Sequence, residues 1–420
     1  MTKNKIVIIG LGYVGLPLAV EFGKIFNTIG FDINKRRIKE LIAGNDTTKE
    51  ISKVDLLSSK YLNFTNHSIN IRKSNIYIIC VPTPITKNKN PNLKYLFNAT
   101  KLVARLLKKN DLIIYESTVY PGLTEEECVP ILENISGMKY NRDFFCGYSP
   151  ERINPGDKKH GLTNICKITS GSTPKIANKV NNLYKRVSKA GTYKVSSIKI
   201  AEAAKIIENV QRDINIALIN EIAMVFDKMK INTQEVLNAA GTKWNFLNFK
   251  PGLVGGHCIG IDPYYLTYQA KKFGVNPKVI LAGRSVNDNM SMFIVKKLLK
   301  EMKIKKINIK KSKILVLGMT FKENCPDVRN SKVIEVVNLL KKRKAKVDVY
   351  DPIANKLEVK SKYKIKLINL NRNNKYDVLI FAVAHDELKK FNKFQKFAKV
   401  KKIIFDIKHL FGTKYPILKL

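Results

Sequence analysis

Apolar and polar residues follow two alternating spacings in the first part of this chain. The segment over residues 5–9, a lysine followed by an unbroken apolar run, is typical of a buried strand. The helical spacing that follows a glycine-rich turn predicts a helix over about 14–26, and the next strand should end at Asp32. Apolar runs over 76–81 and 112–115 predict two more strands. Strands that alternate with helices in this way predict a doubly wound parallel sheet.

The pattern changes at about residue 198, where turn-forming residues disappear. Apolar side chains then recur at helical spacing, which predicts one long helix over 198–229 and further helices to about residue 300. A lysine-rich linker over 303–313 should follow, and an apolar run over 314–317 resembles the first strand. Three further strand-like runs lie at 347–350, 378–383 and 403–406.

We therefore expect an α/β protein with two Rossmann-like doubly wound domains, joined by a long central helix and a helical domain. The expected boundaries are 1–190, 195–300 and 310–420, and a chain of 420 residues is long enough for several cores. The last domain lacks a complete GxGxxG motif, so we expect it to bind something other than a dinucleotide.

The composition is that of a soluble globular protein, with 45% hydrophobic and 26% charged residues, but the formal charge of +42 is unusual. Such a charge suits nucleic acid, an anionic membrane or an acidic ligand, and it also results from a lysine-rich bias spread over a solvated surface. We favour the second reading, because the basic residues are dispersed and no nucleic-acid-binding motif is present. We therefore expect no nucleic-acid partner, although the charge would help to attract a nucleotide diphosphate.

The cysteines and apolar runs bear on where the protein works. Six cysteines show neither CxxC pairing nor zinc spacing, which favours reduced thiols in the cytosol, no metal, and five small core residues besides Cys258. The first twenty residues imitate a signal peptide but contain the glycine turn and Pro17, with no small-residue cleavage site after them. No apolar run elsewhere reaches the ~18 residues of a membrane helix. We expect a cytoplasmic protein without membrane insertion.

A dinucleotide-binding motif occupies the first turn. It follows a predicted strand and opens a predicted helix, which is the context that makes GxGxxG informative. Its glycines would let the backbone approach a pyrophosphate at the helix N-terminus, and Asp32 would accept from the ribose hydroxyls and repel a 2′-phosphate. This pattern favours NAD over NADP. The residues of the turn are Gly10, Leu11, Gly12, Tyr13, Val14 and Gly15.

Two further loops follow predicted strands, so both should lie at the carboxyl edge of the sheet, where ligands bind. The first contains Pro82 and Thr83, and the second runs over 116–122 and contains Ser117 and Thr118. The proline, glycine and hydroxyl residues of each loop are explained equally well as ordinary turn-forming residues without a ligand.

Lys205 and Asn209 lie one turn apart on the long predicted helix and project from one face. A lysine beside an amide is suited to holding an oxyanion or a reacting hydroxyl. The pair does not discriminate between enzymes, because it would also suit a dehydrogenase that carries out a single oxidation.

Cys258 does discriminate. It lies among Gly255, Gly256 and Gly260 and shortly before Asp262, and glycines at this density suggest close backbone approach to a ligand. A thiolate can add to an aldehyde, and the thiohemiacetal can lose a second hydride to give a thioester. The alternative is a buried structural cysteine. His257 fits local scaffolding or mild thiolate stabilisation better than metal binding.

Over nearly its whole length the chain resembles the UDP-glucose/GDP-mannose dehydrogenase family of NAD-dependent nucleotide-sugar 6-dehydrogenases. The form of its cysteine segment is similar to the branch that acts on UDP-N-acetylhexosamines. The segments that carry the resemblance are, in order, GLGYVGLPLA, VPTP, ESTVYPGLTEE, SPERINPGD, AEAAKIIEN, GLVGGHCIGIDPYYL and GMTFKENCPDVRNS.

The resemblance implies roles for individual residues. Catalytic roles fall on Cys258 as nucleophile, on Lys205, Asn209 and Asp262 for the oxyanion and a water, on Glu151 for thioester hydrolysis, and on Thr118 near the nicotinamide. The NAD site would also include Asp32, Arg37, Pro82, Thr83, Ser117 and Arg329 beside the glycine turn. The substrate site would comprise Glu151, Lys205, Asn209, Gly255, Gly256, Phe321 and Lys322. Some relatives have a second glutamate where this chain has Pro155, so Glu151, Asp262 or a water must serve as the hydrolytic base.

The activity implied is oxidation of the C6 hydroxyl of a UDP-N-acetylhexosamine to a carboxylate with two NAD+, by a homodimer that forms through the long helix. The sequence leaves the sugar epimer open. Two other classes also remain open: a single-step NAD-linked hydroxyacid dehydrogenase with a structural Cys258, and a basic nucleic-acid-binding protein with a vestigial nucleotide fold.

Overall fold

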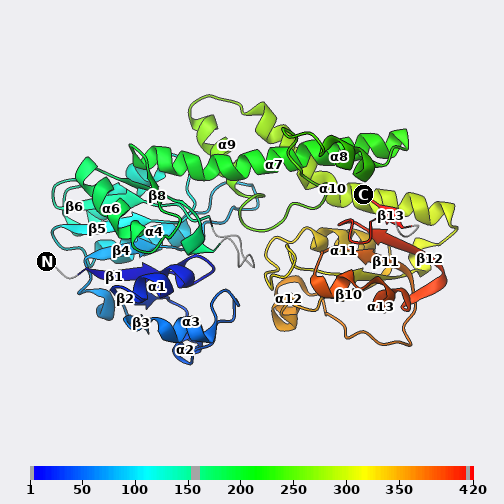
Figure 1. The fold of residues 1–420 in the computed structure, drawn as a ribbon, viewed down its shortest axis with the longest axis horizontal. Helices are drawn as coiled ribbons and strands as arrows, with labels where there is room; N and C mark the ends of the chain where they lie inside the picture. Colours follow the sequence, from blue (N-terminus) through cyan, green and yellow to red (C-terminus); the bar gives the residue numbers. More distant parts are fainter. Residues whose placement is uncertain (1–3, 153–160, 413–416) are drawn as a thin grey trace. The chain divides into compact units, whose positions relative to one another are not determined.

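The computed structural model describes residues 4–152, 161–412 and 417–420, and for Phe391 the backbone alone. The chain divides into two compact units (Figure 1). The N-terminal unit comprises Met1–Glu208 and Tyr264–Asn276, and the C-terminal unit comprises Asn209–Pro263 and Pro277–Leu420. Each unit contains one sheet, so the predicted α/β class with two sheet domains and a long helix is confirmed.

The N-terminal sheet has eight strands in the order β3-β2-β1-β4-β5-β6-β7-β8. Neighbouring strands are parallel except β6 and β7, which pair antiparallel. The order reverses at β1, so the dinucleotide turn lies at the switch point where α/β sheets bind ligands. The strands are β1 (Lys5–Ile9), β2 (Asn27–Phe31), β3 (Leu62–Thr65), β4 (Ile76–Ile79), β5 (Asp111–Tyr115), β6 (Phe144–Tyr148), β7 (Lys167–Gly171) and β8 (Thr192–Lys194).

Helices cover both faces of this sheet. Successive strand residues point to opposite sides, so a strand of apolar residues gives the sheet two apolar faces to bury. Ile114 joins an apolar core with side chains from α1, α2 and α6. The next residue, Tyr115, points the other way and shares a hydrogen bond between its hydroxyl and that of Thr100 on α4 (3.2 Å). The helices are α1 (Gly15–Gly23), α2 (Lys35–Ile42), α3 (Lys53–Ser58), α4 (Lys94–Ala104), α5 (Val129–Ser136) and α6 (Pro174–Lys185).

The predicted long helix is confirmed with the bounds that the spacing indicated. Helix α7 spans Ile198–Met229, which is 32 residues and about 48 Å at 1.5 Å per residue. The boundary between the two units falls within it, after Glu208. Three further helices follow, α8 (Thr233–Ala240), α9 (Asp262–Lys272) and α10 (Lys278–Ile304).

The C-terminal sheet is parallel throughout, in the order β10-β9-β11-β12-β13. Alternate residues of β9 again face two cores, with Ile314 and Val316 on the side of α10 and α11, and Leu315 and Leu317 on the other. The strands are β9 (Lys313–Leu317), β10 (Lys346–Tyr350), β11 (Tyr376–Phe381), β12 (Ala398–Asp406) and β13 (Leu418–Lys419), and the helices are α11 (Val333–Lys342), α12 (Lys356–Tyr363) and α13 (Phe391–Gln395).

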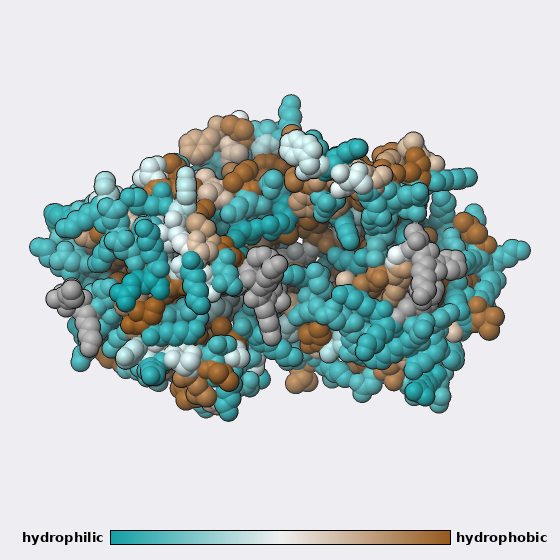
Figure 2. Space-filling view, viewed as in Figure 1, coloured by the Kyte–Doolittle hydropathy of each residue, from teal (hydrophilic) through white to brown (hydrophobic). Residues whose placement is uncertain are grey.

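The surface is largely polar. On the face drawn in Figure 2, hydrophilic side chains predominate and hydrophobic ones gather in separate patches. Within the described part of the chain, none of the helices combines the length and apolar character that crossing a bilayer requires. Cys80, Cys128, Cys146 and Cys325 are buried, but the prediction of a fifth core cysteine is wrong. Cys166 is exposed, because it lies in the connection that precedes β7.

Candidate active site

The glycine turn has the geometry that a pyrophosphate needs. Gly10 follows β1 with φ +93°, and its N–H donates to the carbonyl of Phe31 on the neighbouring strand (2.8 Å). A Cβ on Gly15, the first residue of α1, would lie 1.8 Å from the carbonyl oxygen of Gly10. At Gly12 a Cβ would meet nothing within 4 Å. Two glycines thus pack the turn tightly, and the third leaves open space before the helix N-terminus, which fits a bound diphosphate.

Asp32 and Arg37 both contact this turn. The N–H of Leu11 donates to Oδ2 of Asp32 (2.9 Å), so the carboxylate after β2 lies against the glycine loop. Arg37 donates through Nε to the carbonyl of Leu11 (3.0 Å), and its other end forms an ion pair with Asp46 (2.8 Å). Arg37 is therefore buried and supports the backbone of the turn. This structural role was not predicted, and the predicted contact of Arg37 with a cofactor ribose stays a prediction.

The two predicted edge loops lie together. The hydroxyl of Ser117 donates to the carbonyl of Val81 (2.7 Å), which joins the loop after β5 to the loop after β4. The hydroxyl of Tyr265 on α9 donates to the carbonyl of Thr83 (3.0 Å). Thr118 is half-buried and Pro82 is exposed at the same edge. These contacts bring the predicted nicotinamide-side residues to the carboxyl ends of β4 and β5.

Glu202 on α7 holds the second of these loops, and the sequence analysis missed it. Its carboxylate is fully buried and accepts from the N–H of Gly122 (2.6 Å) and of Thr124 (3.0 Å). Burial raises the pKa of Glu202 to about 7, although the hydrogen bonds from Thr124 and Gly122 oppose the shift. The sequence did offer a signal for Glu202. It lies one helical turn before Lys205 on the long predicted helix, so the two side chains lie on the same face.

Glu151 lies just beyond β6 and is buried. Its Oε2 accepts from Nζ of Lys167 (3.0 Å), and its Oε1 accepts from the N–H of Arg152 (2.5 Å). Lys167 was not predicted, because its contact with Glu151 depends on the antiparallel pairing of β6 with β7. Pro155, the departure from the family pattern, lies outside the described residues.

On α7, Lys205 and Asn209 are both buried one turn apart, at 5% and 1% exposure. The side-chain Nδ2 of Asn209 donates to Oδ2 of Asp262 at 2.6 Å. The backbone N–H of Asp262 in turn donates to the carbonyl of Cys258 (2.8 Å). The structure therefore brings together three of the predicted residues, Asn209, Asp262 and Cys258, at the turn that precedes α9.

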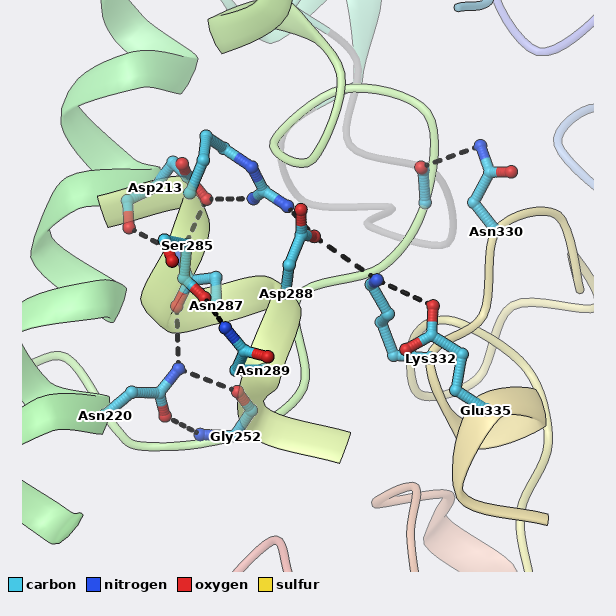
Figure 3. Close-up of polar contacts among 12 residues, drawn as sticks. Asp213, Asn220, Gly252, Ser285, Asn287, Asp288, Asn289, Asn330, Lys332 and Glu335 are labelled. Atoms are coloured by element: carbon cyan, nitrogen blue, oxygen red, sulfur yellow. Dashed lines mark hydrogen bonds and ion pairs between the residues drawn. The ribbon is translucent and has the colours of Figure 1, made fainter. Parts of the chain in front are cut away.

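A polar network anchors the start of the cysteine segment (Figure 3). Asn220 on α7 accepts from the N–H of Gly252 (2.7 Å) and donates to its carbonyl (3.0 Å). The Nδ2 of Asn220 also donates to Oδ1 of Asn287 (2.8 Å), and Nδ2 of Asn287 donates to Oδ1 of Asp213 (2.7 Å). Arg284 completes the network with an ion pair to Asp213 (2.6 Å). These buried contacts fix the backbone at Gly252, six residues before Cys258.

Packing within the chain accounts for the glycines of this segment. A Cβ on Gly255 would lie 2.8 Å from the carbonyl oxygen of Asn330, and one on Gly256 would lie 2.7 Å from the ring of Phe321. Gly256 also has φ +83°, and its carbonyl accepts from Nδ2 of Asn330 (3.2 Å). The segment after β9 packs so closely that side chains at Gly255 and Gly256 would clash with it. We had inferred a nearby ligand from these same glycines. Their predicted contact with substrate stays a prediction.

His257 joins a charged cluster in the C-terminal unit. Its Nε2 lies 2.8 Å from Oδ2 of Asp327, and Asp327 is also paired with Arg329 (2.6 Å). The pKa of Asp327 is lowered, because Arg329 and His257 outweigh the opposing effect of burial. Arg329 also contacts the ring of His257. Arg329, which the resemblance assigns to the cofactor, thus contacts the residue next to Cys258.

The predicted UDP-contacting pair follows β9, where Phe321 and Lys322 are half-buried. Lys408, after β12, is a basic residue that the sequence analysis missed. Its Nζ would lie 3.5 Å from a Cβ on Gly252. Burial lowers the pKa of Lys408, and the charge of Glu323 opposes that shift. Its place after a parallel strand was the signal that could have identified it.

Comparisons with known proteins identify the family of this chain. Three models of the UDP-glucose/GDP-mannose dehydrogenase family match the chain: the NAD binding domain at residues 4–188, the central domain at 199–289 and the UDP binding domain at 315–413. The chain is 52% identical to UDP-N-acetyl-D-glucosamine 6-dehydrogenase of Salmonella typhi, over 99% of this chain and 98% of that one. It is 51% identical to the protein of that name in Pseudomonas aeruginosa, over 100% of both chains. The solved structure of the UDP-D-ManNAc dehydrogenase from Pyrococcus horikoshii superposes with a TM-score of 0.89 at 30% identity, over 99% of this chain and 98% of that one.

Proposed function

Because this chain belongs to the UDP-glucose/GDP-mannose dehydrogenase family and is an NAD-dependent oxidoreductase, we propose that it oxidises the C6 hydroxyl of UDP-N-acetylglucosamine to the carboxylate. Two full-length relatives of about half-identical sequence carry that activity in their names, which supports the choice of sugar. The same chemistry on UDP-N-acetylgalactosamine, UDP-N-acetylmannosamine or UDP-glucose is the alternative.

The observation that carries the chemistry is the placement of Cys258 beside the Asn209–Asp262 pair. Asp262 holds the amide of Asn209 at 2.6 Å, and its own N–H is bonded to the carbonyl of Cys258. A thiol whose neighbouring polar groups are fixed in this way is suited to forming a covalent intermediate with a carbonyl carbon. Asn209 and Lys205, one turn apart on α7, would stabilise the negative charge that develops on the oxygen.

The reaction then proceeds in four chemical steps. The substrate alcohol loses a hydride and a proton to give an aldehyde, and the thiolate of Cys258 adds to the aldehyde as a thiohemiacetal. Loss of a second hydride gives a thioester, which water cleaves to the carboxylate and the free thiol. Bound NAD+ supplies the hydride acceptor in both oxidations, so each sugar consumes two NAD+ and one water. Glu151 would take the proton of the attacking water.

The binding residues follow from the same proposal. NAD+ would lie over the glycine turn, with Asp32 at the ribose and Ser117 and Thr118 near the nicotinamide. The uridine diphosphate would bind the C-terminal unit, with Lys322 neutralising phosphate charge beside Phe321. Arg329 would serve the cofactor only after a change of partner, because Asp327 and His257 now engage it.

We also propose a homodimer that forms through α7. Ile200, Ile207, Leu218 and Val225 are each about half exposed, at 48%, 54%, 54% and 49%. At 100° per residue these four side chains fall within about 20° of one line along the helix. A straight apolar stripe on a long helix is suited to packing against its own copy across a twofold axis. Leu218→Lys should shift the solution mass from dimer towards monomer, and a mass unchanged by that charge would contradict this interface.

The cellular setting completes the proposal. The product would be an acidic nucleotide sugar, which suits the synthesis of a surface polysaccharide such as a capsule by a cytoplasmic enzyme. The test of the activity is the yield of NADH from a panel of UDP-sugars. We expect two NADH per UDP-N-acetylglucosamine consumed. One NADH per sugar, with free aldehyde accumulating, would instead favour a single-step dehydrogenase with a structural Cys258.

A further inference from the structure

Four titratable side chains form a buried cluster in the N-terminal unit, around the ammonium of Lys167. Glu116 follows β5, Glu151 lies beyond β6, Lys167 opens β7 and Tyr184 lies on α6. All four are nearly inaccessible to solvent, with at most 6% of the side chain exposed at Glu151. Buried charges are costly unless they are paired, so a cluster of this kind needs a reason to persist.

The antiparallel strand explains how the cluster forms. β5 and β6 are parallel, so Glu116 and Glu151 leave the sheet at the same edge. β7 runs the other way, which brings its first residue rather than its last to that edge. Tyr148 pairs with Ser170, and continuing this register by three residues places Glu151 opposite Lys167.

Lys167 uses all three of its protons at this edge. Nζ donates to Oε2 of Glu116 (2.8 Å), to Oε2 of Glu151 (3.0 Å) and to the carbonyl of Pro150 (2.9 Å). The hydroxyl of Tyr184 donates to Oε1 of Glu116. The ammonium of Lys167 therefore bridges the carboxylates of Glu116 and Glu151. It also binds the backbone carbonyl of the residue that precedes Glu151.

We propose that Lys167 is a positioning residue that, together with Glu116, fixes the carboxylate of Glu151 for the hydrolytic step. The inference rests on the proposed function, since it concerns the hydrolytic step of that reaction. Each carboxylate oxygen offers about two acceptor sites. Lys167 and the N–H of Arg152 each occupy one site on Glu151, on different oxygens, which fixes the plane of the carboxylate.

Glu116 makes this arrangement sensitive to pH. With two ionised carboxylates and one ammonium the buried cluster would carry a net negative charge. Burial raises the pKa of Glu116 to about 7, with the charge of Lys167 opposing the shift and that of Glu151 adding to it. When Glu116 gains a proton, the cluster loses the negative charge that would favour proton transfer from the water, and Lys167 pairs with Glu151 alone. Hydrolysis should therefore speed up as the pH rises through about 7.

Two other protonatable groups among the described residues, the hydroxyl of Tyr184 within the cluster and the thiol of Cys80 after β4, do not compete in this range. Burial, with the charge of Glu116 adding, raises the pKa of each well above its ordinary value, so both stay protonated near neutrality. Within this cluster, the group that titrates near pH 7 is therefore Glu116.

The experiment separates hydride transfer from hydrolysis in the full-length enzyme. UDP-N-acetylglucosamine and NAD+ are mixed rapidly with Lys167→Met, and NADH is followed through the first turnover and in steady state. We expect the first turnover to release two NADH per active site at close to the wild-type rate. The steady-state kcat should fall on the order of a hundredfold, because a general base contributes roughly 10²–10⁴-fold. The thioester on Cys258 should accumulate and be visible as added mass on the intact protein.

Two further variants keep the test decisive. Lys297→Met removes another ion-paired lysine, bonded to Asp227 at 2.7 Å, and should leave the kcat and the first turnover unchanged. Glu116→Gln keeps the shape of the cluster, and should abolish the rise of kcat around pH 7 even if Lys167→Met fails to fold. A wild-type pH profile in Glu116→Gln would overturn the inference, as would equal slowing of the first turnover and the steady state in Lys167→Met. Wild-type enzyme that yields one NADH or none per sugar would overturn the proposed function itself.

Discussion

Asp351 occupies in the C-terminal unit the position that Asp32 occupies in the N-terminal unit, yet its carboxylate is already saturated with partners. Each aspartate directly follows the second strand of its sheet, β10 or β2. Gly318 repeats the geometry of Gly10, with φ +92° and an N–H bonded to the neighbouring strand (2.8 Å). The N–H of Met319 then donates to Asp351 (2.6 Å), as that of Leu11 does to Asp32.

The difference lies in the other partners of Asp351. Its carboxylate also accepts from the N–H groups of Thr320, Ile353 and Ala354, and it lies 3.2 Å from Nε2 of His385. Asp351 is buried, whereas Asp32 is half-buried and also accepts from the N–H of Asn34. The first unit therefore retains a carboxylate that can bind ribose hydroxyls, and in the second unit the equivalent carboxylate closes the turn.

The available carboxylate of Asp32 should make the enzyme prefer NAD+ over NADP+. A 2′-phosphate would lie against its negative charge, and the ribose hydroxyls would lose an acceptor if it were removed. In Asp32→Ser the kcat/KM for NAD+ should fall about tenfold, and that for NADP+ should rise, since one hydrogen bond to a charged group contributes roughly 1.5–3 kcal/mol. Initial rates with each cofactor measure the ratio. Equal use of both cofactors by the wild-type enzyme would refute this assignment.

Replacing Cys258 with serine should stop formation of the acid. An alcohol is a much weaker nucleophile than a thiolate, so no thioester equivalent forms at a useful rate. We expect turnover to fall at least a hundredfold, in line with the roughly 10²–10⁴-fold effects of losing a catalytic group. NAD+ affinity, measured by calorimetry, should not change. The control is Cys166→Ser, at the exposed cysteine, which should keep full activity. Near-normal acid production by Cys258→Ser would make Cys258 structural.

Glu202 should make the loop that it holds sensitive to pH. Because burial raises its pKa to about 7 in the folded protein, its stabilising effect is complete below about pH 4.5 and is lost as the pH rises through about 7. Relative to Glu202→Gln, the wild-type free energy of unfolding should therefore decrease across that window, by on the order of 3 kcal/mol. Urea unfolding at several pH values measures the difference. The control is Glu126→Gln, at an exposed glutamate. If the difference in unfolding free energy between the wild type and Glu202→Gln did not change with pH, the prediction would be refuted.

The sequence and the structure agree where a residue's position follows from local order along the chain. The glycine turn, Asp32 and the loops after β4 and β5 could be predicted, because parallel strands place their following residues at one edge. The long helix could be predicted from spacing alone. Lys167 could not, because its meeting with Glu151 depends on the reversed direction of β7, which no local pattern encodes.

The cysteine segment shows a second limit. We predicted a ligand from the density of glycines around Cys258, and the structure explains Gly255 and Gly256 by the approach of Phe321 and Asn330 from a distant part of the chain. A glycine indicates that something lies close, but its neighbours in sequence do not say what. The position of Asp327 between His257 and Arg329 depends on the same long-range packing, so its role could not be inferred either.

Removing the charge of Lys322 should weaken binding of the UDP-sugar and leave NAD+ binding intact. In Lys322→Ala we expect the KM for the sugar to rise about tenfold, since a charge-assisted hydrogen bond contributes roughly 1.5–3 kcal/mol. Lys332→Ala is the matched control, because Lys332 lies in the same unit and its charge is held by Glu335 (2.7 Å) and Asp288 (3.3 Å), as Figure 3 shows. An unchanged sugar KM in Lys322→Ala, or an equal rise in the control, would place the diphosphate elsewhere.

The N-acetylated sugar should be preferred over UDP-glucose. The motivation is the cysteine segment GGHCIGIDPYYL, together with two relatives named for UDP-N-acetyl-D-glucosamine. A pocket shaped for the acetamide leaves polar groups unpaired when only a hydroxyl is present, and each such group costs roughly 1–3 kcal/mol. We therefore expect kcat/KM for UDP-N-acetylglucosamine to exceed that for UDP-glucose by on the order of ten- to a hundredfold. Side-by-side assays that include UDP-N-acetylgalactosamine distinguish recognition of the acetamide from recognition of the C4 epimer. Equal or faster turnover of UDP-glucose would assign this chain to the other branch of the family.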